Sequence, residues 1–468
     1  MSRTHNNHNS KMTSEVAVVM VPFVAQGHLN QLLHLSHLIS AYNIPIHFIS
    51  TATHIRQARI RLHGWNSHNN LIQFHELPDP DFISPHPNPN GTVSFPTHLQ
   101  PVFNSSLRLR GPVADFVRSL AETSRRVAVV HDSAMSCVVQ DVKFMSNVET
   151  YIFRALSVFY TYCSNLDRLR RELPFAPEML PRLPSSDETM SGEFMEFVKL
   201  QYEHQTFHVG NIYDSSRVIE GTFLESLERE EICGKNHWAV GPFNPVEIQT
   251  DVSNSDRHAS LKWLDKQPER SVVYVSFGTT TTFTVSQIRE LAMGLEKSEQ
   301  RFLWVLRDAD KGDVFNNDMI RRVVLPDGFE NRVEGRGLVV REWAPQVEIL
   351  GHLSVGGFVS HCGWNSCMEA MTCGVAVAAW PIHSDQPRNA FLLVEVLKVA
   401  LMMREWACRD KLLTSVMVEK VVRRLMDTKE GAAIRKRAAE VGGELRRSLA
   451  NGGISRKELD SLIAYIRR

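Results

Sequence analysis

Alternation of short apolar runs with helix-forming segments is the feature that most limits how this chain can fold. Glu15–Phe23 is a Val-rich run that suits one buried strand, and it leads through Gly27 into a segment with leucines at helical spacing. The same order returns later, where an apolar run that begins at Ser271 leads into Gly278. Chains that alternate in this way form parallel sheets covered by helices. We therefore expect an α/β protein of two doubly wound, Rossmann-like domains that face each other across a cleft.

Length and one polar segment indicate where the two domains divide. The chain has 468 residues, more than one compact core normally holds. Residues 247–260 are polar and rich in Ser, Asn and Asp, which is typical of a linker. The expected division is a disordered extension at 1–14, an N-terminal domain at 15–246, the linker at 247–260, a C-terminal domain at 261–445 and a final helix at 446–468 that packs back on the N-terminal domain.

Composition argues against several classes of function. Lys and Arg together number 52, as do Asp and Glu, so the balanced charge gives no electrostatic footprint for nucleic acid or for an anionic membrane. Seven cysteines are scattered without the spacing of a zinc site, which suits a reducing compartment. The first residues lack the apolar core of a signal peptide, and no run is long enough to span a membrane. We therefore expect a cytoplasmic monomer that binds no nucleic acid and does not insert into a membrane.

The 44 residues from Trp343 to Gln386 carry the strongest functional pattern. GGFVSH predicts a buried strand, Gly363 a tight turn, and Asn365 and Ser366 the capping residues of a helix that follows. A strand that leads through such a turn into a helix aims unpaired N–H groups and the positive end of the helix dipole at one point, which suits a phosphate. His361 adds a further donor there. This stretch therefore predicts a diphosphate site.

Other side chains of the same stretch suit the remaining parts of a nucleotide sugar. Trp343 offers a flat face on which a base can stack. Glu369, one turn into the helix, can accept hydrogen bonds from the vicinal hydroxyls of a ribose. Asp385 and Gln386 offer a carboxylate and an amide to a group that is rich in hydroxyls. Base, ribose, diphosphate and sugar are all provided for, and no clustered carboxylate motif predicts a metal ion.

This stretch resembles the signature motif of the plant secondary-product glycosyltransferases, which use UDP-sugars. The match runs without a gap from WAPQ through HCGWNS and Glu369 to the closing DQ. The resemblance implies a GT-B fold, inverting glycosyl transfer without a metal or other cofactor, an acceptor site in the N-terminal domain and a UDP-sugar site in the C-terminal domain. The donor contacts that it implies are Thr281, Trp343, Ala344, Gln346, His361, Gly363, Trp364, Asn365, Ser366, Glu369, Asp385 and Gln386.

Two strand ends in the N-terminal half carry a candidate base and its partner. His28 follows the first strand, and Asp132 ends a later apolar run. Since the carboxyl ends of parallel strands meet at one edge of a sheet, the two side chains can converge. A carboxylate on the far nitrogen of an imidazole fixes its tautomer and stabilises the imidazolium that forms after proton abstraction. We expect His28 to be the catalytic base and Asp132 its partner, as the resemblance also implies. His131 is expected to be a bystander, and Asp141 is a fallback carboxylate.

Three further segments of the N-terminal half carry structural expectations. The proline-rich stretch Leu77–Pro101 predicts a long surface loop that shapes an acceptor pocket. Arg126–Val142 predicts a strand followed by a helix. Ser216–Phe223, with its Val, Ile and Thr, predicts the last strand before the segment that closes the domain.

Stretches outside the motif resemble the plant cytokinin (zeatin) O-glucosyltransferases, among them HDSAMSCVVQD, GNIYDSSRVIEG, SFGTTTT and PIHSDQPRNA. This resemblance implies transfer of glucose from UDP-glucose to a hydroxyl of a small plant metabolite, with zeatin as the first expectation. Trp364 and Gln386 match the glucose-using pattern. A flavonoid or terpenoid acceptor stays open, as does UDP-xylose as the donor, because xylose differs from glucose by one hydroxymethyl group.

Two other classes of protein fit this sequence less well than a glycosyltransferase does. A dinucleotide-dependent oxidoreductase would use two Rossmann-like domains, but no GxGxxG fingerprint follows a strand. A non-catalytic small-molecule-binding protein would carry a degenerate site, whereas His28, Asp132 and the long motif are intact. The residues favour the enzyme that transfers a sugar.

Overall fold

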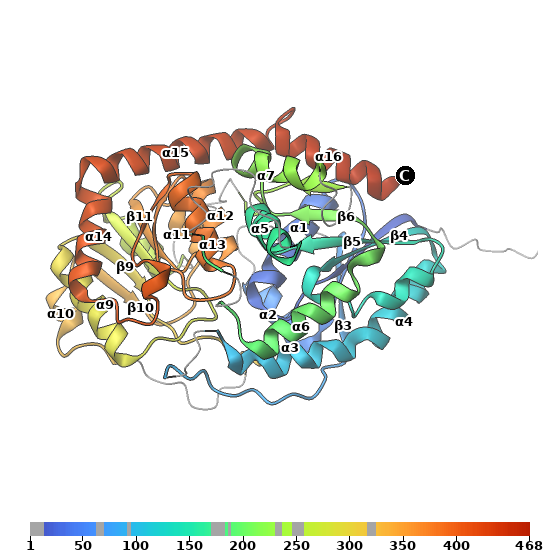
Figure 1. Ribbon diagram of the computed structural model, residues 1–468, viewed down its shortest axis with the longest axis horizontal. Helices are drawn as coiled ribbons and strands as arrows, with labels where there is room; N and C mark the ends of the chain where they lie inside the picture. The colour runs from blue at the N-terminus through green and yellow to red at the C-terminus, as the bar shows by residue number, and fades with distance from the viewer. Residues whose placement is uncertain are drawn as a thin grey trace, which may run out of the picture.

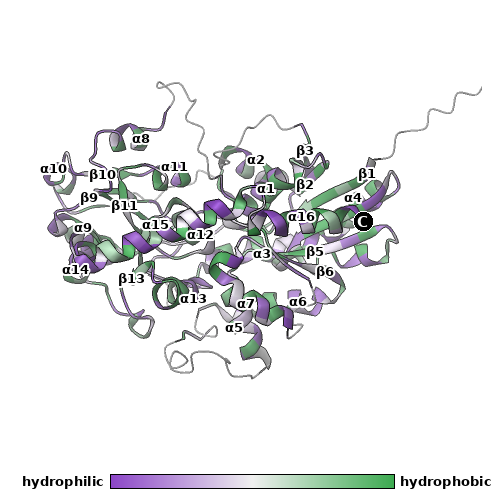
Figure 2. Cartoon of the chain, turned by 90° about the horizontal axis from the view of Figure 1, so that it is seen from above, coloured by the Kyte–Doolittle hydropathy of each residue, from purple (hydrophilic) through white to green (hydrophobic). Residues whose placement is uncertain are grey.

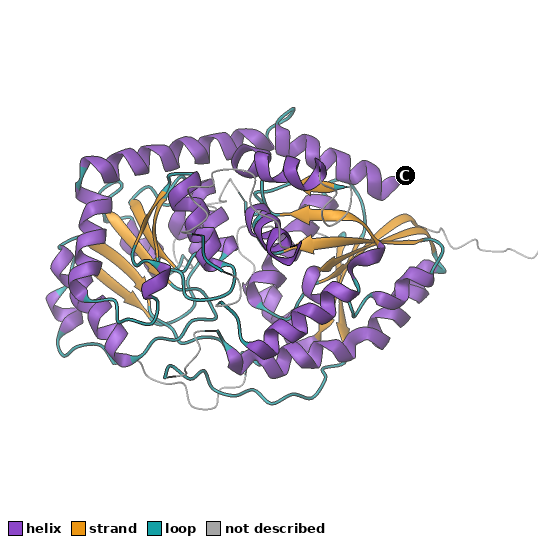
Figure 3. Ribbon diagram, viewed as in Figure 1, coloured by secondary structure: helices purple, strands orange, loops and turns teal. Residues whose placement is uncertain are grey.

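The computed structural model describes residues 14–61, 70–90, 95–169, 183–185, 189–229, 236–245, 257–315 and 324–468. These residues form two parallel sheets, each flanked by helices, that stand side by side (Figures 1 and 3). This arrangement confirms the predicted pair of doubly wound α/β domains. Residues 1–13 of the predicted extension, 247–256 of the predicted linker and 91–94 of the predicted acceptor loop lie outside the described residues. Ser14, the last residue of the predicted extension, instead begins the first strand.

The N-terminal sheet has, within the described part of the chain, the strand order β3-β2-β1-β4-β5-β6-β7, all parallel. Its strands are β1 (Ser14–Val21), β2 (Ile46–Thr51), β3 (Ile72–Leu77), β4 (Ser124–Asp132), β5 (Val148–Arg154), β6 (His208–Tyr213) and β7 (His237–Ala239). The strand order reverses between β1 and β4. In open sheets of this kind, a crevice for ligands forms at the carboxyl ends of the two strands where the order reverses.

Helices cover both faces of the N-terminal sheet. They are α1 (Gln26–Ser40), α2 (Ala52–Arg61), α3 (Gln100–Ser106), α4 (Arg110–Ala121), α5 (Val158–Leu169), α6 (Gly192–Glu203) and α7 (Arg217–Arg229). Alternate residues of β1 point to opposite faces. Val18 and Met20 pack with leucines of α1, whereas Val19 and Val21 pack with residues of α3 and α4.

Two predicted elements of this domain are wrong. Ser216–Phe223 is not a strand: it enters α7, because the apolar residues Ile219, Phe223 and Leu227 recur at helical spacing and are buried together. The strand of this region is β6, which lies a few residues earlier. After β4 the chain forms short 3₁₀ turns, at Ser133–Met135 and Gln140–Phe144, where an α-helix was expected.

The C-terminal sheet has the order β10-β9-β8-β11-β12-β13 among the described residues, again all parallel. Its strands are β8 (Val272–Ser276), β9 (Arg301–Val305), β10 (Gly337–Val340), β11 (Val355–Ser360), β12 (Ala376–Ala379) and β13 (Ala400–Met402). Its helices are α8 (Ala259–Leu264), α9 (Val285–Ser298), α10 (Phe329–Arg332), α11 (Gln346–Leu350), α12 (Trp364–Cys373), α13 (Gln386–Phe391), α14 (Ser415–Asp427) and α15 (Lys429–Leu449). The order reverses between β8 and β11, which places a second crevice at their carboxyl ends.

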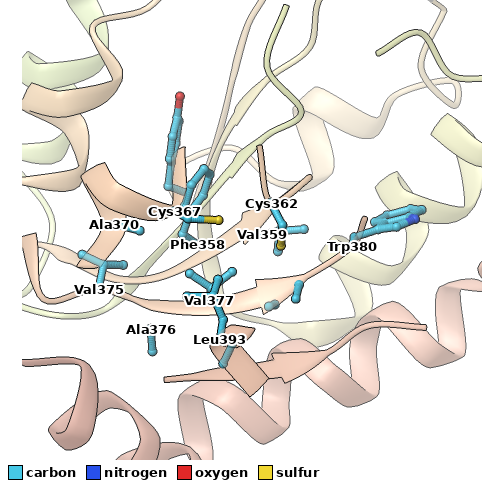
Figure 4. Close-up of a cluster of buried hydrophobic side chains, with 14 of the residues drawn as sticks. Phe358, Val359, Cys362, Cys367, Ala370, Val375, Ala376, Val377, Trp380 and Leu393 are labelled. Carbon is cyan, nitrogen blue, oxygen red and sulfur yellow. The ribbon is translucent and has the colours of Figure 1, made fainter. Parts of the chain in front are cut away.

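The motif at 343–386 encloses a dense apolar core. Phe358 and Val359 of β11, Val377 of β12 and Cys367 of α12 are all buried in one cluster (Figure 4). Interiors packed in this way hold their backbone rigidly. The turn and the helix α12 that follow β11 are therefore held rigidly at the crevice.

The last two helices join the domains. α15 runs along the C-terminal domain toward the N-terminal one, and α16 (Ile454–Arg467) lies on the N-terminal domain (Figure 1). Leu459, Leu462 and Ile466 of α16 are buried in the same cluster as Val18 of β1. The predicted boundary between 445 and 446 falls inside α15, and the predicted linker end at 259–260 falls inside α8.

Hydropathy follows this arrangement. Figure 2 shows β1 in the green of hydrophobic residues, whereas α15 alternates between purple and green along its length. α15 buries residues such as Val441 and Leu445, which lie four positions apart on one face of the helix. In the part of the chain that the structure describes, no helix has the length and hydropathy of a membrane span.

Candidate active site

A cavity of about 370 Å³ lies between the two domains, at the carboxyl ends of both sheets. The N-terminal domain contributes His28 and the residues around it, and the C-terminal domain contributes the motif. The predicted donor residues that line this cavity are Trp343, Ala344, Gln346, His361, Gly363, Trp364, Asn365, Ser366, Glu369, Asp385 and Gln386. The fold therefore brings the candidate base and the motif to one site.

His28 and Asp132 meet at the reversal point of the N-terminal sheet. His28 Nδ1 lies 2.7 Å from Asp132 Oδ2, and the Asp132 side chain is fully buried behind the ring. The backbone N–H of Ala134 donates to Asp132 Oδ1 at 2.8 Å and holds the carboxylate in place. Because a carboxylate accepts, Nδ1 carries the proton in this pair, and Nε2 is left with the lone pair that a base needs.

Electrostatics around His28 favour its protonated form. Burial lowers the pKa of His28, but the charge of Asp132, its hydrogen bond and the charge of Asp385 together leave the pKa above its ordinary value. An imidazole that has just taken a proton is stabilised by the same two carboxylates. The arrangement thus suits a base whose charged form appears during the reaction.

The two neighbouring candidates have other surroundings. His131, the residue before Asp132 on β4, is buried, its Nδ1 lies 2.9 Å from the Asp132 backbone oxygen, and burial lowers its pKa to about 4. Asp141 lies at the surface, where it forms a two-point ion pair with Arg110 at 2.7 Å. The fallback assignment of Asp141 is therefore wrong, since its carboxylate is already held by Arg110 away from the cavity.

The turn after β11 differs from its prediction. Cys362, not Gly363, takes the left-handed backbone conformation, with φ of 63°. A side chain on Gly363 would approach His361 Nε2 to 2.6 Å, and one on Gly278 would approach the same ring to 2.7 Å. The two glycines therefore make room for the imidazole. Burial lowers the pKa of His361 to about 4, so the ring is neutral and can donate from one nitrogen.

Asn365 and Ser366 are wrong as helix-capping residues. α12 begins at Trp364, so both lie in its first turn and its N-cap is Gly363, which has no side chain for capping. Their side chains instead contact other elements: Asn365 Nδ2 donates to the Gly27 oxygen at 2.8 Å, and Ser366 Oγ accepts from Gln346 Nε2 at 2.8 Å. Trp364, Asn365 and Ser366 of this first turn line the cavity, and the start of a helix is a position that suits an anion.

Glu369 lies one turn further along α12. Gln346 Nε2 donates to Glu369 Oε2 at 2.6 Å. Burial raises the pKa of Glu369 to about 7, the Gln346 hydrogen bond lowers it, and the charge of Asp214 raises it further. Trp343 and Ala344 line the cavity from the segment before α11. A flat ring and a carboxyl group therefore line one cavity, as a base and a ribose would require.

Asp385 and Gln386 lie at the start of α13. Asn389 Nδ2 donates to Asp385 Oδ2 at 2.5 Å, and the Gln386 side-chain oxygen accepts from the backbone N–H groups of Ile382 and His383. Burial raises the pKa of Asp385 to about 6, and the positive charge of His28 opposes that shift. This interaction places the predicted sugar-binding carboxylate within electrostatic reach of the candidate base.

Thr281 is the predicted donor contact that does not line the cavity. It is buried, and its Oγ1 has no hydrogen-bond partner among the described residues. Thr279 and Thr280 line the cavity instead, and Thr280 Oγ1 lies 3.2 Å from His383 Nε2. The sequence alone does not show which of the four threonines lines the cavity, because that depends on how the chain leaves Gly278, where φ is 70°.

Several residues at the cavity belong to no recognisable sequence motif. Arg154, at the end of β5, and Gln205 line the N-terminal part of the cavity. Asp214, which follows β6, lies behind this lining and accepts from Nε1 of the cavity residue Trp364 through its backbone oxygen at 2.8 Å. The signal in the sequence for Arg154 is its place directly after the apolar residues Tyr151, Ile152 and Phe153, where a buried strand ends.

Two protein-family models together match most of the chain. Residues 14–245 match the family model for the glycosyltransferase N-terminal domain, and residues 235–427 match the model for UDP-glucoronosyl and UDP-glucosyl transferase. A zeatin O-glucosyltransferase of Phaseolus lunatus is 49% identical, over 97% of this chain and 97% of its own. The chain belongs to the UDP-glycosyltransferase family.

Other relatives agree with this membership. A zeatin O-xylosyltransferase of Phaseolus vulgaris is also 49% identical to the UDP-glycosyltransferase described here, over 97% of this chain and 99% of its own. The structure of Phytolacca americana UGT2 complexed with UDP-2fluoro-glucose and pterostilbene is 25% identical, covers 97% of this chain and 100% of its own, and has a TM-score of 0.75. These findings confirm the predicted family, the GT-B fold and the enzyme class.

Proposed function

We propose that this enzyme transfers glucose from UDP-glucose to a hydroxyl of zeatin, with inversion at the anomeric carbon. The observation that carries the proposal is the contact of 2.7 Å between the buried Asp132 and His28, which lines the same cavity as the motif. The names of two relatives that are each 49% identical support zeatin as the acceptor. Retention of the base, its partner and the motif argues against a protein that only binds a small molecule.

The reaction assigned to this geometry has one proton transfer and one displacement. His28 Nε2 takes the proton of the acceptor hydroxyl, and Asp132 stabilises the imidazolium that results. The acceptor oxygen then attacks the anomeric carbon from the face opposite the UDP group. The bond to the diphosphate breaks, and a donor with an α-linked sugar yields a β-glycoside.

The charge that develops on the leaving diphosphate requires donors. The first-turn N–H groups of α12 and the neutral ring of His361 are in place to supply them. We therefore propose that turnover requires no metal ion or other cofactor. We also propose that the enzyme acts as a cytoplasmic monomer in plant secondary metabolism, with Trp343 under the base and Glu369 on the ribose.

A second donor has specific support. The relative from Phaseolus vulgaris carries xylosyltransferase in its name at the same identity as the glucosyltransferase. Xylose lacks the hydroxymethyl group of glucose, and a pocket discriminates poorly against a smaller substrate of this kind. UDP-xylose is therefore the alternative donor, and a flavonoid or terpenoid alcohol is the alternative acceptor.

The test is product formation by the purified full chain. UDP-glucose and UDP-xylose are each incubated with trans-zeatin, cis-zeatin, a flavonol and a terpenoid alcohol, with and without EDTA, and glycosides are identified by mass. We expect a zeatin glucoside with a β linkage, at a rate that EDTA does not change. Product from a flavonoid alone would contradict zeatin as the acceptor, and an α linkage would contradict inversion.

A further inference from the structure

Arg154 occupies the third of three neighbouring strand ends at the cavity. His28 follows β1, Asp132 ends β4 and Arg154 ends β5, and these strands are adjacent in the sheet. Asp132 pairs with Phe153 across β4 and β5, so Arg154 lies one residue beyond that register, toward the cavity. Neighbouring strands are about 4.8 Å apart. A cation is therefore built into the N-terminal side of the cavity, on the strand next to the one that carries Asp132.

The guanidinium of Arg154 is held by neutral amide side chains. Its Nε donates to Asn211 Oδ1 at 2.8 Å, and one terminal nitrogen donates to Gln205 Oε1 at 3.1 Å. Gln205 is fixed in turn, because its Nε2 donates to the Ser133 oxygen at 3.3 Å. Arg154 is 2% exposed, yet it lines the cavity together with Gln205 and Ser133. This buried polar side of the cavity has a fixed orientation before any acceptor arrives.

Aromatic rings from the N-terminal domain also line the cavity. The Phe23 ring lies 5.2 Å from the His28 ring and 4.8 Å from Phe103, and Phe194 lies 4.7 Å from Phe95 and 5.6 Å from Phe103. These four phenylalanines all line the cavity. A flat, apolar ring system gains most from such a wall. The acceptor side therefore combines an aromatic wall with one buried cationic fork.

The chemistry of the fork limits what it can recognise. A guanidinium has only donors, so a group that it recognises must present lone pairs in the plane of its N–H bonds. We propose that Arg154 selects the acceptor by donating hydrogen bonds to ring lone pairs of a planar heteroaromatic compound whose hydroxyl lies at His28. This inference rests on the proposed function and deepens it, because it states which half of the acceptor the enzyme reads apart from the hydroxyl.

The test compares two acceptors that share an allylic primary alcohol and a planar ring. trans-Zeatin has ring nitrogens with lone pairs, whereas cinnamyl alcohol has a plain benzene ring. Dissociation constants of both are measured by calorimetry with saturating UDP for the wild type, Arg154→Met, Arg154→Lys and the surface control Arg118→Met. Arg118 is 57% exposed and is paired with Asp115 on the same helix. Melting temperatures report on folding.

Loss of a charge-assisted pair of hydrogen bonds weakens binding about tenfold to a hundredfold. We expect that loss for trans-zeatin in Arg154→Met, a smaller loss in Arg154→Lys because lysine lacks the planar fork, and less than a twofold change for cinnamyl alcohol. Equal weakening of both acceptors, or unchanged binding of trans-zeatin, would overturn the proposal. If the Met variant does not fold, the Lys variant decides. Weaker binding of trans-zeatin alone supports the proposal, and equal weakening of the binding of both acceptors overturns it.

The experiments distinguish failure of the proposed function from failure of the proposed role of Arg154. A wild-type enzyme that makes no zeatin glucoside contradicts the proposed function. A wild-type enzyme that makes the glucoside, with an affinity for trans-zeatin that does not depend on residue 154, contradicts only the role of Arg154.

Discussion

Asn365 Nδ2 donates a hydrogen bond of 2.8 Å to the backbone oxygen of Gly27, the residue directly before His28. Asn365 belongs to the first turn of α12 in the motif, and Gly27 belongs to the first turn of α1. One hydrogen bond therefore connects the predicted diphosphate site in one domain to the candidate base in the other. A contact to a residue adjacent to a base controls where the base points.

Replacement of Asn365 by Ala is expected to lower kcat as well as donor affinity. The lost hydrogen bond corresponds to about 1 kcal/mol, and misplacement of the base turns that loss into roughly a tenfold decrease in kcat. Steady-state kinetics with varied UDP-glucose measures both constants. Asn331→Ala, an exposed position in α10, is the control. A raised donor KM with an unchanged kcat would mean that the contact with Gly27 does not position His28.

Replacement of His28 by Ala removes the base and leaves the motif intact. We expect kcat to fall by about 10² to 10⁴, the usual contribution of a general base, while the dissociation constant of UDP changes less than about threefold. Single-turnover product formation and calorimetry with UDP measure the two effects. His86→Ala, at an exposed position, serves as the matched control. Lost UDP binding together with lost turnover would assign His28 to the donor site instead.

Replacement of Asp132 by Asn changes the pH dependence of kcat/KM. The charge of Asp132 helps to raise the pKa of His28, so its removal lowers that pKa and moves the acid limb of the profile to lower pH. The plateau is expected to fall at least about a hundredfold, because the imidazolium loses its partner. Asp141→Asn, at the surface ion pair with Arg110, should leave the profile unchanged. An acid limb that stays in place would show that another group titrates.

Replacement of Glu369 by Ala tests the ribose assignment. We expect the KM for UDP-glucose to rise about tenfold, with kcat and the acceptor KM within about twofold, since only a binding contact is lost. Gln346, which donates to Glu369 at 2.6 Å, keeps its second partner Ser366. The exposed Glu440→Ala variant is the control. An unchanged donor KM removes Glu369 from the ribose site.

Buried histidines of α1 predict sensitivity to acid. Burial lowers the pKa of His37 to about 4, below the value of about 6.5 in an unfolded chain. Because the folded state binds this proton less tightly, the contribution of neutral His37 to the free energy of unfolding is fully present above pH 6.5 and is lost as pH falls toward 4. At pH 5.5 the loss is about 1 kcal/mol for this residue. The free energy of unfolding is measured with urea at pH 7.5 and 5.5. Its decrease between these two pH values should be smaller by this amount in His37→Gln than in the wild type, and unchanged in His86→Gln. Equal acid loss in both variants would contradict the assignment.

Sequence predicted the two α/β domains because apolar runs and helical spacing are local properties that the fold preserves. It also placed the strand and the helix of the motif correctly, as β11 and α12, since a strand, turn and helix within 44 residues leave little freedom. It failed for Ser216–Phe223, where β-branched residues favour a strand locally but the spacing of Ile219, Phe223 and Leu227 gives a buried helical face. There, burial of the face outweighs propensity.

Within the site, sequence alone determined which chemical groups are present: an imidazole, a carboxylate, a flat indole and the start of a helix. Tertiary structure decided which of these groups meet. It put Asp132 on His28 and Asp141 on Arg110, it placed Thr279 and Thr280 rather than Thr281 at the cavity, and it brought Arg154 to the same cavity as His28. The physical reason is that contacts between distant residues depend on strand order and on rigid packing between elements, and neither can be read from the residues next to each other in the chain.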